Sequence, residues 1–312
     1  MSHVDKLKEK LNLTKKEILP IDAEVEVRGE DTIHMLMQYF QPNYKLKRNN
    51  HRIAVCFTGQ IRTGVEVAPM MKDFFGELYN ELDFFIHTWD TESFSPWAGD
   101  RSKMDAAEAR KLIPVDLKKI EKIKEIYDPI GMIVDNLSEY KRTHPGGVEN
   151  RPGIHHQIAP WWISGYECNK LKKKYELLCG VQYFRVLRIR FDVIFTPKYR
   201  LIKELMYMAS YPNALYSVDR HNRLHEAIED IAWLSTGEII DKVNDFVLNR
   251  EENSLPLGTM DDYTHFQQYL IENKIYARPF KNNDVYLYRD FDVANNLSPY
   301  DKPLNNDETT LQ

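Results

Sequence analysis

The chain has 312 residues, of which 43% are hydrophobic and 29% are charged, and its formal net charge at pH 7 is −5. This composition is typical of a soluble globular protein with a sizeable core, built as one large domain or two small ones, and it excludes a disordered chain. The weak negative charge gives no global attraction to nucleic acid or to an anionic membrane, so neither is an expected partner.

Cysteine usage and the N-terminus indicate the compartment. Cys56, Cys168 and Cys179 are odd in number and lack C-x-x-C spacing, which fits a reducing compartment better than a disulfide framework. Residues 1–20 hold no apolar core of a secretory signal, and no stretch approaches the ~18 apolar residues of a membrane helix. We therefore expect a cytoplasmic protein without a transmembrane segment.

The chain divides into three parts by pattern. Residues 1–50 predict an N-terminal helical extension, with a charged amphipathic helix near 4–12 and a second apolar-periodic stretch near 31–40. Residues 51–291 carry the strand and helix patterns of the main domain. Residues 292–312 form a polar tail that we expect to be loosely held.

Strands and helices alternate in the main domain. "RIAVCFTG" (52–59) and "LDFFIHTW" (82–89) predict strands on either side of a helical stretch at 65–80, which is a βαβ unit with parallel strands. Further helices are expected near 103–127, 160–179, 236–248 and 261–273, further strands near 131–136, 185–195, 214–218, 275–279 and 285–289, and a loop at 137–160. The alternation predicts an α/β fold: a mostly parallel central sheet with helices on both faces.

In such sheets ligands bind beyond the carboxyl ends of the parallel strands, so the loop "TGQIRTG" (58–64) is a candidate site. Gly59 lets the backbone approach a ligand, and Arg62, flanked by Gln60 and Thr63, offers a positive charge where a helix N-terminus favours an anion. The loop is neither a G-x-G-x-x-G motif nor a P-loop. The alternative is a tight turn with a solvated arginine.

One histidine and three tryptophans each have both a structural and a functional interpretation. His87 ends a predicted buried strand, where it either hydrogen-bonds into the core or faces a ligand. Trp89, Trp161 and Trp162 either pack in the core or stack on the face of a sugar.

The stretch "RVLRIRFDVIF" (185–195) places charges on a hydrophobic strand. With side chains alternating every two residues, one face is fully apolar and the other carries Arg188, Arg190 and Asp192 in a column. The column is either the solvated face of an antiparallel strand or a charged binding surface.

Acidic candidates lie downstream. Glu229 and Asp230 are adjacent and precede an apolar stretch, where they either cap a helix or face a cleft as a general base. His155 and His156 are adjacent with no Cys or carboxylate at ligand spacing, so they do not indicate a zinc site.

"VLRIRFDVIF" resembles the metal-binding region of GT-A glycosyltransferases, where a strand runs into a D-x-D motif that holds a divalent metal on the nucleotide-sugar diphosphate. Here Asp192 stands at the second acidic position and Arg190 where the first Asp is expected. "RIAVCFTGQIRTG…FFIHTWD" is similar to the opening of glycosyltransferase-like proteins of bacterial surface-polysaccharide loci and large viruses, in which R-x-R-x-D replaces D-x-D. "IEDIAWLSTGEIIDKV" is similar to their acceptor-side segment.

The resemblance covers about 52–275 and implies a GT-A-like, Rossmann-related catalytic domain that moves a sugar from a nucleotide-diphosphate donor to a glycan hydroxyl. It implies Asp230, with Glu229 beside it, as the acceptor base. The donor residues it implies are Gly59, Gln60, Arg62, Thr63, His87, Arg188, Arg190 and Asp192. The resemblance also implies Asp192 as the ligand of Mn²⁺ or Mg²⁺. One carboxylate alone is a poor site, although these ions often use only one or two carboxylates with phosphates and water. The alternative is that Arg190 neutralises the diphosphate itself with no metal. The alternative function is a catalytically inactive module that binds a nucleotide sugar or a glycan.

Overall fold

The structure is a computed structural model that describes residues 47–76, 81–92, 112–143, 158–195, 211–218, 231–248, 262–280 and 285–287. The expected N-terminal helices, the polar tail and the candidate bases Glu229 and Asp230 lie outside these ranges.

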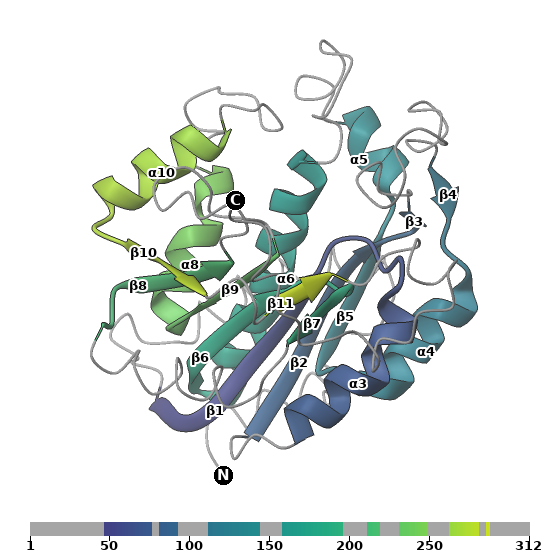
Figure 1. Cartoon of the computed structure of the whole chain (residues 1–312), viewed down its shortest axis with the longest axis horizontal. Helices are drawn as coiled ribbons and strands as arrows, with labels where there is room; N and C mark the ends of the chain where they lie inside the picture. The colour runs from purple at the N-terminus through teal and green to yellow at the C-terminus, as the bar shows by residue number, and fades with distance from the viewer. Residues whose placement is uncertain are drawn as a thin grey trace, which may run out of the picture.

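Strands and helices alternate along the described chain (Figure 1). The strands are β1 (Lys47–Thr58), β2 (Glu81–Trp89), β3 (Thr91–Glu92), β4 (Ile113–Pro114), β5 (Gly131–Asp135), β6 (Val181–Ile189), β7 (Val193–Phe195), β8 (Ala214–Val218), β9 (Ala232–Ser235), β10 (Tyr276–Phe280) and β11 (Val285–Leu287). The helices are α3 (Gly64–Gly76), α4 (Leu117–Tyr127), α5 (Leu137–Thr143), α6 (Ile158–Cys179), α8 (Gly237–Asn244) and α10 (Asp262–Glu272).

Seven strands form one mixed sheet in the order β10-β8-β9-β6-β1-β2-β5. The pairs β6–β1, β1–β2, β2–β5 and β8–β10 are parallel, and only β9 runs against its two neighbours. The predicted βαβ unit is confirmed by the parallel register of β1 and β2, in which Thr58 lies opposite His87. The fold class expected from the sequence, a mostly parallel α/β sheet, is therefore confirmed.

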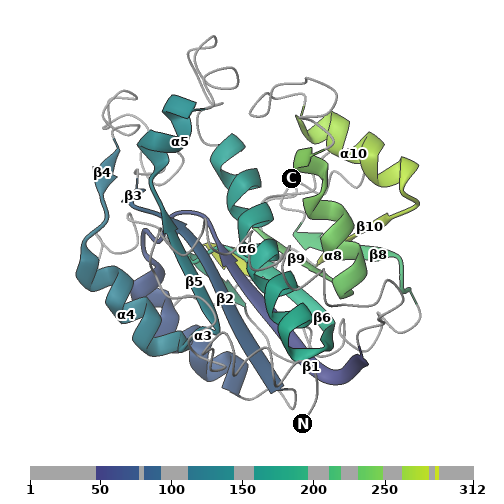
Figure 2. The same cartoon turned by 180° about the vertical axis from the view of Figure 1, so that it is seen from behind.

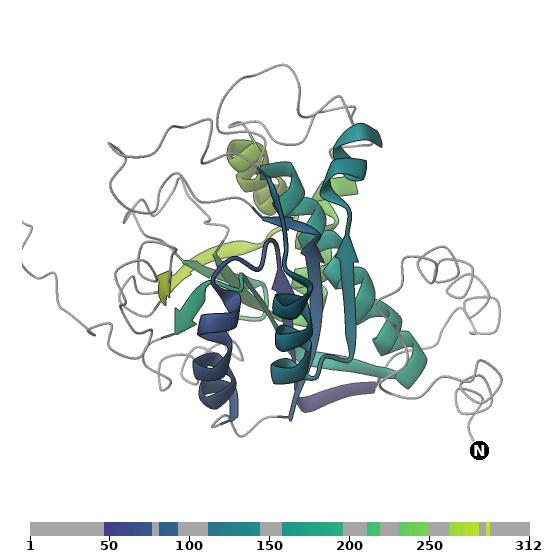
Figure 3. The ribbon, with the colours of Figure 1, turned by 90° about the vertical axis from the view of Figure 1, so that its right-hand side faces the viewer.

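Helices cover both faces of the sheet, which Figure 3 shows nearly edge-on. On one face α3 and α4 bury an apolar layer that includes Val55, Phe57 and Phe84. On the other face, seen in Figure 2, α6, α8 and α10 bury a second layer rich in aromatic rings, including Trp162, Trp233 and Phe266. Alternating residues of β1 enter the two layers, as period-two geometry requires.

The chain reverses direction at β1. It moves from β1 to β2 and β5 with α3 and α4 on one face, and then returns across the other face through α6 to β6, on the far side of β1. The carboxyl ends of β1 and β6 therefore flank the point where strand order reverses. Ligands of doubly wound sheets bind at such points.

Three local features differ from the sequence expectation. The charged stretch 185–195 is not one strand, because β6 ends at Ile189 and β7 leaves the main sheet to pair antiparallel with β11. The expected loop at 137–160 contains α5, whose first turn is capped when Asn136 Oδ1 accepts the N–H of Glu139 at 2.6 Å. The apolar stretch after Asp230 is the strand β9, which the sequence did not predict.

The loop that follows β6 packs against the loop that follows β1. Phe191 turns into the layer under α3, where its ring lies 5.3 Å from that of Phe57. A Cβ at Gly64, the first residue of α3, would lie 2.7 Å from the Cβ of Phe191, so the two segments touch backbone against side chain. This contact fixes the loop after β6 against the loop after β1.

Candidate functional site

Two loops meet at the reversal point, Gly59–Thr63 after β1 and Arg190–Asp192 after β6. Gly59 has φ +99° and Arg62 has φ 48°, so the first loop turns twice through left-handed backbone. The Arg190 N–H donates to the carbonyl of Ile231 at 3.1 Å, which ties the second loop to the start of β9.

Four side chains of these loops form what we call the arginine–aspartate cluster: Gln60, Arg62, Arg190 and Asp192. Arg190 donates from Nε and Nη2 to the two oxygens of Asp192, at 3.0 and 2.8 Å. Arg62 Nη1 lies 3.9 Å from Asp192 Oδ2, and Arg62 also donates from Nε and Nη2 to Gln60 Oε1, at 3.2 and 3.0 Å.

The cluster carries two positive charges and one negative charge. The Asp192 carboxylate is 2% exposed, whereas the guanidinium side chains of Arg62 and Arg190 are 12% and 14% exposed. The carboxylate is therefore sealed beneath cations that still reach the surface. Partly desolvated arginines with planar N–H groups are suited to bind phosphate oxygens in pairs.

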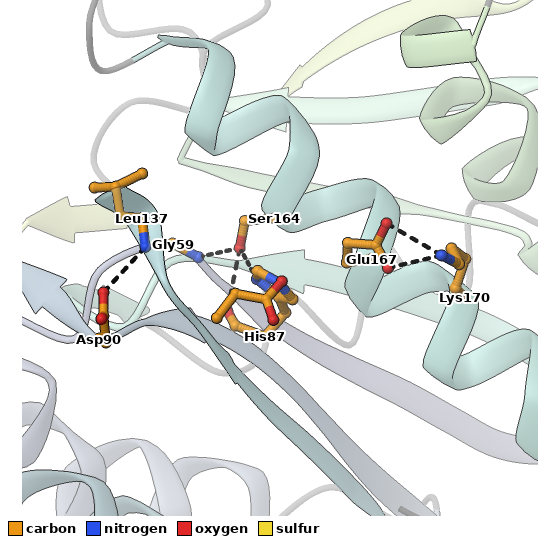
Figure 4. A network of polar contacts seen from close by, with 8 residues as sticks. Gly59, His87, Asp90, Leu137, Ser164, Glu167 and Lys170 are labelled. Atoms are coloured by element: carbon orange, nitrogen blue, oxygen red, sulfur yellow. Dashed lines mark hydrogen bonds and ion pairs between the residues drawn. The ribbon is translucent and has the colours of Figure 1, made fainter. Parts of the chain in front are cut away.

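The amino end of the first loop is held by a buried chain of polar contacts (Figure 4). The Gly59 N–H donates to Ser164 Oγ on α6 at 2.7 Å. Ser164 Oγ lies 2.9 Å from His87 Nδ1, and His87 Nε2 lies 2.8 Å from Asp135 Oδ2 at the end of β5. We call Asp135, His87 and Ser164 the polar relay. His87 and Ser164 are fully buried.

The other end of the loop is held from the opposite layer. The Arg62 N–H donates to Glu92 Oε2 at 2.8 Å. Lys119 on α4 donates to Glu92 Oε1 at 2.7 Å and to the Arg62 carbonyl at 3.1 Å. We call Glu92 and Lys119 the backbone clasp, because together they bind both polar groups of a residue in left-handed conformation.

Arg188 does not join the cluster. Its guanidinium lies 3.9 Å from the Trp161 ring and 4.6 Å from the Trp233 ring, and it donates to the Trp161 carbonyl at 2.8 Å. It also donates to Thr58 Oγ1 and Asn244 Oδ1, both at 3.3 Å, and is 2% exposed. The expected charged column is thus divided, with Arg188 in the core, Arg190 partly exposed in the loop after β6, and Asp192 buried beneath it.

Of the donor residues named from the sequence, Gln60, Arg62, Arg190 and Asp192 come together, with Gly59 and Thr63 in the same loop. His87 lies beneath the loop, with each ring nitrogen bonded to a protein oxygen. Trp89 and Trp162 are core residues, and Trp161 is 8% exposed. Glu229 and Asp230 fall outside the described ranges. The helix-cap interpretation of this pair is wrong, because a strand follows it and Thr236 caps α8.

Sequence reasoning missed four residues that support the site: Asp135, Ser164, Glu92 and Lys119. Asp135 could have been found, because it ends a predicted parallel strand, the same position that singled out His87. Ser164 and Lys119 lie within helices and carry no signal of their own. Their partners are 105 and 57 residues away in the chain, at Gly59 and Arg62.

The described residues do not fit a divalent metal at Asp192. No group of three or more His, Cys, Asp or Glu side chains that could hold an ion occurs among them. Both oxygens of Asp192 are already bonded to Arg190, and a second arginine lies beside them. Adjacent cations oppose a further positive ion at this carboxylate.

The buried groups near the relay do not suit covalent catalysis. Burial raises the pKa of the Cys168 thiol well above its usual range, and the hydrogen bond with Cys56 acts in the same direction. A protonated, fully buried thiol is a poor nucleophile. Ser164 is likewise inaccessible, with its hydroxyl committed to the Gly59 amide. What the site offers is a preset loop and two surface cations.

Among the described helices, none has the length and hydropathy that crossing a bilayer requires.

Comparison with known proteins finds no matching family model and no matching curated protein. Among solved structures, a nucleotide-diphospho-sugar transferase from Desulfovibrio desulfuricans is 11% identical over 74% of this chain and 80% of that chain, at TM-score 0.37. A Pyrobaculum calidifontis mannosyltransferase in complex with GDP-Man and Mn²⁺ is 7% identical over 92% and 67%, at TM-score 0.36. Mouse xyloside xylosyltransferase 1 is 8% identical over 75% and 85%, at TM-score 0.37. At these scores the likeness carries no argument about activity.

Proposed function

We propose that the protein is a glycosyltransferase that binds a nucleotide-diphosphate sugar at the reversal point and transfers the sugar to a hydroxyl of a glycan acceptor. The observation that carries the proposal is the arginine–aspartate cluster, in which Arg62 and Arg190 from separate loops converge on one buried carboxylate. A diphosphate is the ligand that two such cations beside a βα turn suit best.

The cluster would act on the leaving group. When the bond between sugar and diphosphate breaks, negative charge accumulates on the diphosphate oxygens. Cations already fixed in place stabilise that charge without reorganising. In this proposal Arg62 and Arg190 contact the diphosphate, Asp192 orients them, and the amides of the Gly59–Thr63 loop lie against the nucleotide. Arg188 and His87 shape the floor of the site and contact no ligand.

We assign Asp230 as the acceptor base if the reaction inverts the anomeric centre, with Glu229 as the second candidate. Asp230 directly precedes Ile231, whose carbonyl accepts the Arg190 N–H, and Glu229 precedes Asp230. Asp230 is therefore the chain neighbour of a residue that is hydrogen-bonded to the loop after β6. The base would take the proton of the acceptor hydroxyl as that oxygen attacks the sugar.

We further propose that Arg190 takes the place of a metal ion, since Asp192 is already paired with Arg190.

The free thiols of Cys56, Cys168 and Cys179 support a reducing, cytoplasmic setting.

A thermal-shift panel of UDP-, GDP-, CMP- and dTDP-sugars, run with EDTA and with Mn²⁺, tests the proposal. A donor that binds only the native state adds about 2.7 kcal/mol at 100 times its Kd, so the best donor should raise the Tm, and EDTA should leave the shift intact. Arg190→Ala should weaken donor binding about tenfold to a hundredfold, the loss of about 1.5–3 kcal/mol for a charge-assisted hydrogen bond. Arg190→Lys should restore it only in part.

Arg278→Ala is the matched control, because it removes an equal charge from an exposed arginine that lies over Tyr211 at the β10 edge. Its donor affinity should equal that of the parent. If no nucleotide sugar shifts the Tm, the proposal fails. If a donor binds but no acceptor in a glycan array gains a sugar, the protein is the inactive binding module instead.

A further inference from the structure

The Ser164 hydroxyl has more polar neighbours than a serine in a helix usually has. Its Oγ lies 2.7 Å from the Gly59 nitrogen, 2.9 Å from His87 Nδ1 and 3.1 Å from the His87 carbonyl oxygen. All three distances are within hydrogen-bond range, and the residue is fully buried. Figure 4 shows Ser164 between Gly59 and His87.

Counting protons shows how the three contacts can coexist. A hydroxyl has one proton to donate and two lone pairs to accept. The Gly59 N–H occupies one lone pair, and the His87 carbonyl can only accept, so it takes the hydroxyl proton. The remaining lone pair faces Nδ1, which satisfies the contact only by donating a proton of its own.

The other ring nitrogen of His87 is constrained in the same way. Nε2 lies 2.8 Å from Asp135 Oδ2, and an ionised carboxylate can only accept. All four contacts are therefore made together when both ring nitrogens carry protons and Asp135 balances the charge. Without the proton on Nδ1, Ser164 has to give its own proton to that nitrogen, and the contact with the His87 carbonyl is lost.

Titratable and charged groups of every neighbouring element surround this arrangement. Asp135 faces His87 from β5, and Cys168 contacts it from α6. Cys56 on β1 and Arg188 on β6 interact with Cys168. The Trp89 ring lies 5.1 Å from the His87 ring, edge to face. Asp135 is the carboxylate in direct contact with the imidazole.

We propose that Ser164 is a positioning residue for the donor, and that a proton on His87 Nδ1, the ring nitrogen that faces Ser164, sets the direction in which the Ser164 hydroxyl points. This inference rests on the proposed function. Ser164 fixes the Gly59 amide, and with it the turn that leads to Gln60 and Arg62, before any donor arrives. Deprotonation of His87 removes one contact from the relay and loosens that turn.

The test measures the affinity for UDP and GDP by calorimetry from about pH 5 to about pH 8. In the parent protein the affinity should fall as pH rises, because Ser164 then donates to Nδ1 and loses its contact with the His87 carbonyl. Ser164→Ala should weaken binding about threefold to tenfold at low pH, the loss expected for one neutral hydrogen bond, and should flatten the pH dependence. Asp135→Asn, which keeps an acceptor for Nε2 but removes the charge, should move the fall in affinity to lower pH.

Ser235→Ala is the matched control. Ser235 on β9 is also fully buried, and its hydroxyl donates to the Ala214 carbonyl at 2.6 Å, away from the loop. The variant should lose stability yet keep the parent's affinity and pH profile. A general structural effect of losing a buried serine hydroxyl would instead weaken binding in both variants.

The outcomes are distinguishable. If the parent binds neither nucleotide nor any sugar of the panel, both the proposed function and this inference fail. If the parent binds UDP or GDP, and Ser164→Ala binds equally well with the same pH profile, only this inference is overturned. Should Ser164→Ala not fold, an unshifted pH profile in Asp135→Asn overturns it as well.

Discussion

Two buried tyrosines show how much one hydroxyl can matter. Tyr127 and Tyr183 are 1% and 2% exposed, and burial raises the pKa of each phenol above its ordinary value. The Tyr183 hydroxyl donates to Asp83 Oδ2 at 2.7 Å. The Tyr127 hydroxyl has no hydrogen-bond partner among the residues that the structure describes. The same mutation should therefore have opposite signs at the two sites.

Tyr127→Phe should raise the free energy of unfolding by up to about 1 kcal/mol, since it removes an unpaired buried polar group. Tyr183→Phe should lower it by about 1–3 kcal/mol, because the Asp83 carboxylate loses a donor. The pKa of Tyr127 is raised in the folded state, so above pH ~10 the phenol ionises first in the unfolded state and the free energy of unfolding falls. Phenylalanine cannot ionise, and the advantage of Tyr127→Phe should therefore grow in alkali. Urea unfolding at pH 7 and pH 10.5 measures both effects, and two changes of the same sign at pH 7 would contradict the argument.

Arg188 shows that strand alternation alone does not predict whether a charged side chain is buried. Period-two alternation correctly puts Arg188 on the face opposite Leu187 and Ile189, which lie in the other apolar layer. It says nothing about Trp161 and Trp233, which come from α6 and β9 and enclose the guanidinium. Alternation assigns a side chain to a face, and only tertiary contacts decide whether that face is wet.

At the scale of elements, the long periodic segments were predictable and the short ones were not. β1, β2, α3 and α6 agree with their patterns, because each has enough residues to show its period. β9 has four residues, all buried, so its pattern cannot be told from the start of a helix. α5 was missed although Asn136 and Glu139 have the N-x-x-E spacing of a capped helix, because the Pro and Gly residues that follow suggested a loop.

The backbone clasp allows a test of how α4 supports the loop after β1. Lys119→Met removes the donor to the Arg62 carbonyl and the counter-ion of Glu92, whose side chain is 11% exposed. Arg62 then holds its left-handed conformation with one contact fewer, so UDP affinity should fall about fivefold, the effect of about 1 kcal/mol.

Lys122→Met on the same helix is the control. The Lys122 Nζ lies 2.9 Å from Glu125, but both side chains are largely exposed, at 48% and 69%. Pairs of this kind contribute little, so affinity should not change. Equal losses in the two variants would mean that net charge, rather than the clasp, governs binding.

At the scale of the whole molecule, β1 joins the strands β2 and β5 to the other half of the main sheet, which begins with β6. In the described part of the main sheet, β1 lies between β2 and β6 and is parallel to both. Among the described residues, Lys47–Asn49 at its start lie opposite Val181–Tyr183 of β6, and the register shifts before Ile53. The sequence pattern predicts the boundary of the main domain after residue 50, and β1 begins at Lys47.

Two truncations separate these boundaries. Removing residues 1–44 leaves every described pair of β1 in place, and we expect UDP affinity within about threefold of the parent, or roughly 0.6 kcal/mol. Removing residues 1–50 deletes the pairing of Lys47–Asn49 with β6 and should cost about 1–3 kcal/mol of unfolding free energy, at about 1 kcal/mol for each backbone hydrogen bond lost. Urea unfolding of both proteins measures the difference.

Since the lost pairs lie at the opposite end of β1 from Gly59, the longer truncation should lower stability more than affinity. A tenfold loss of UDP affinity in the shorter truncation would show that the first 44 residues contribute to the site.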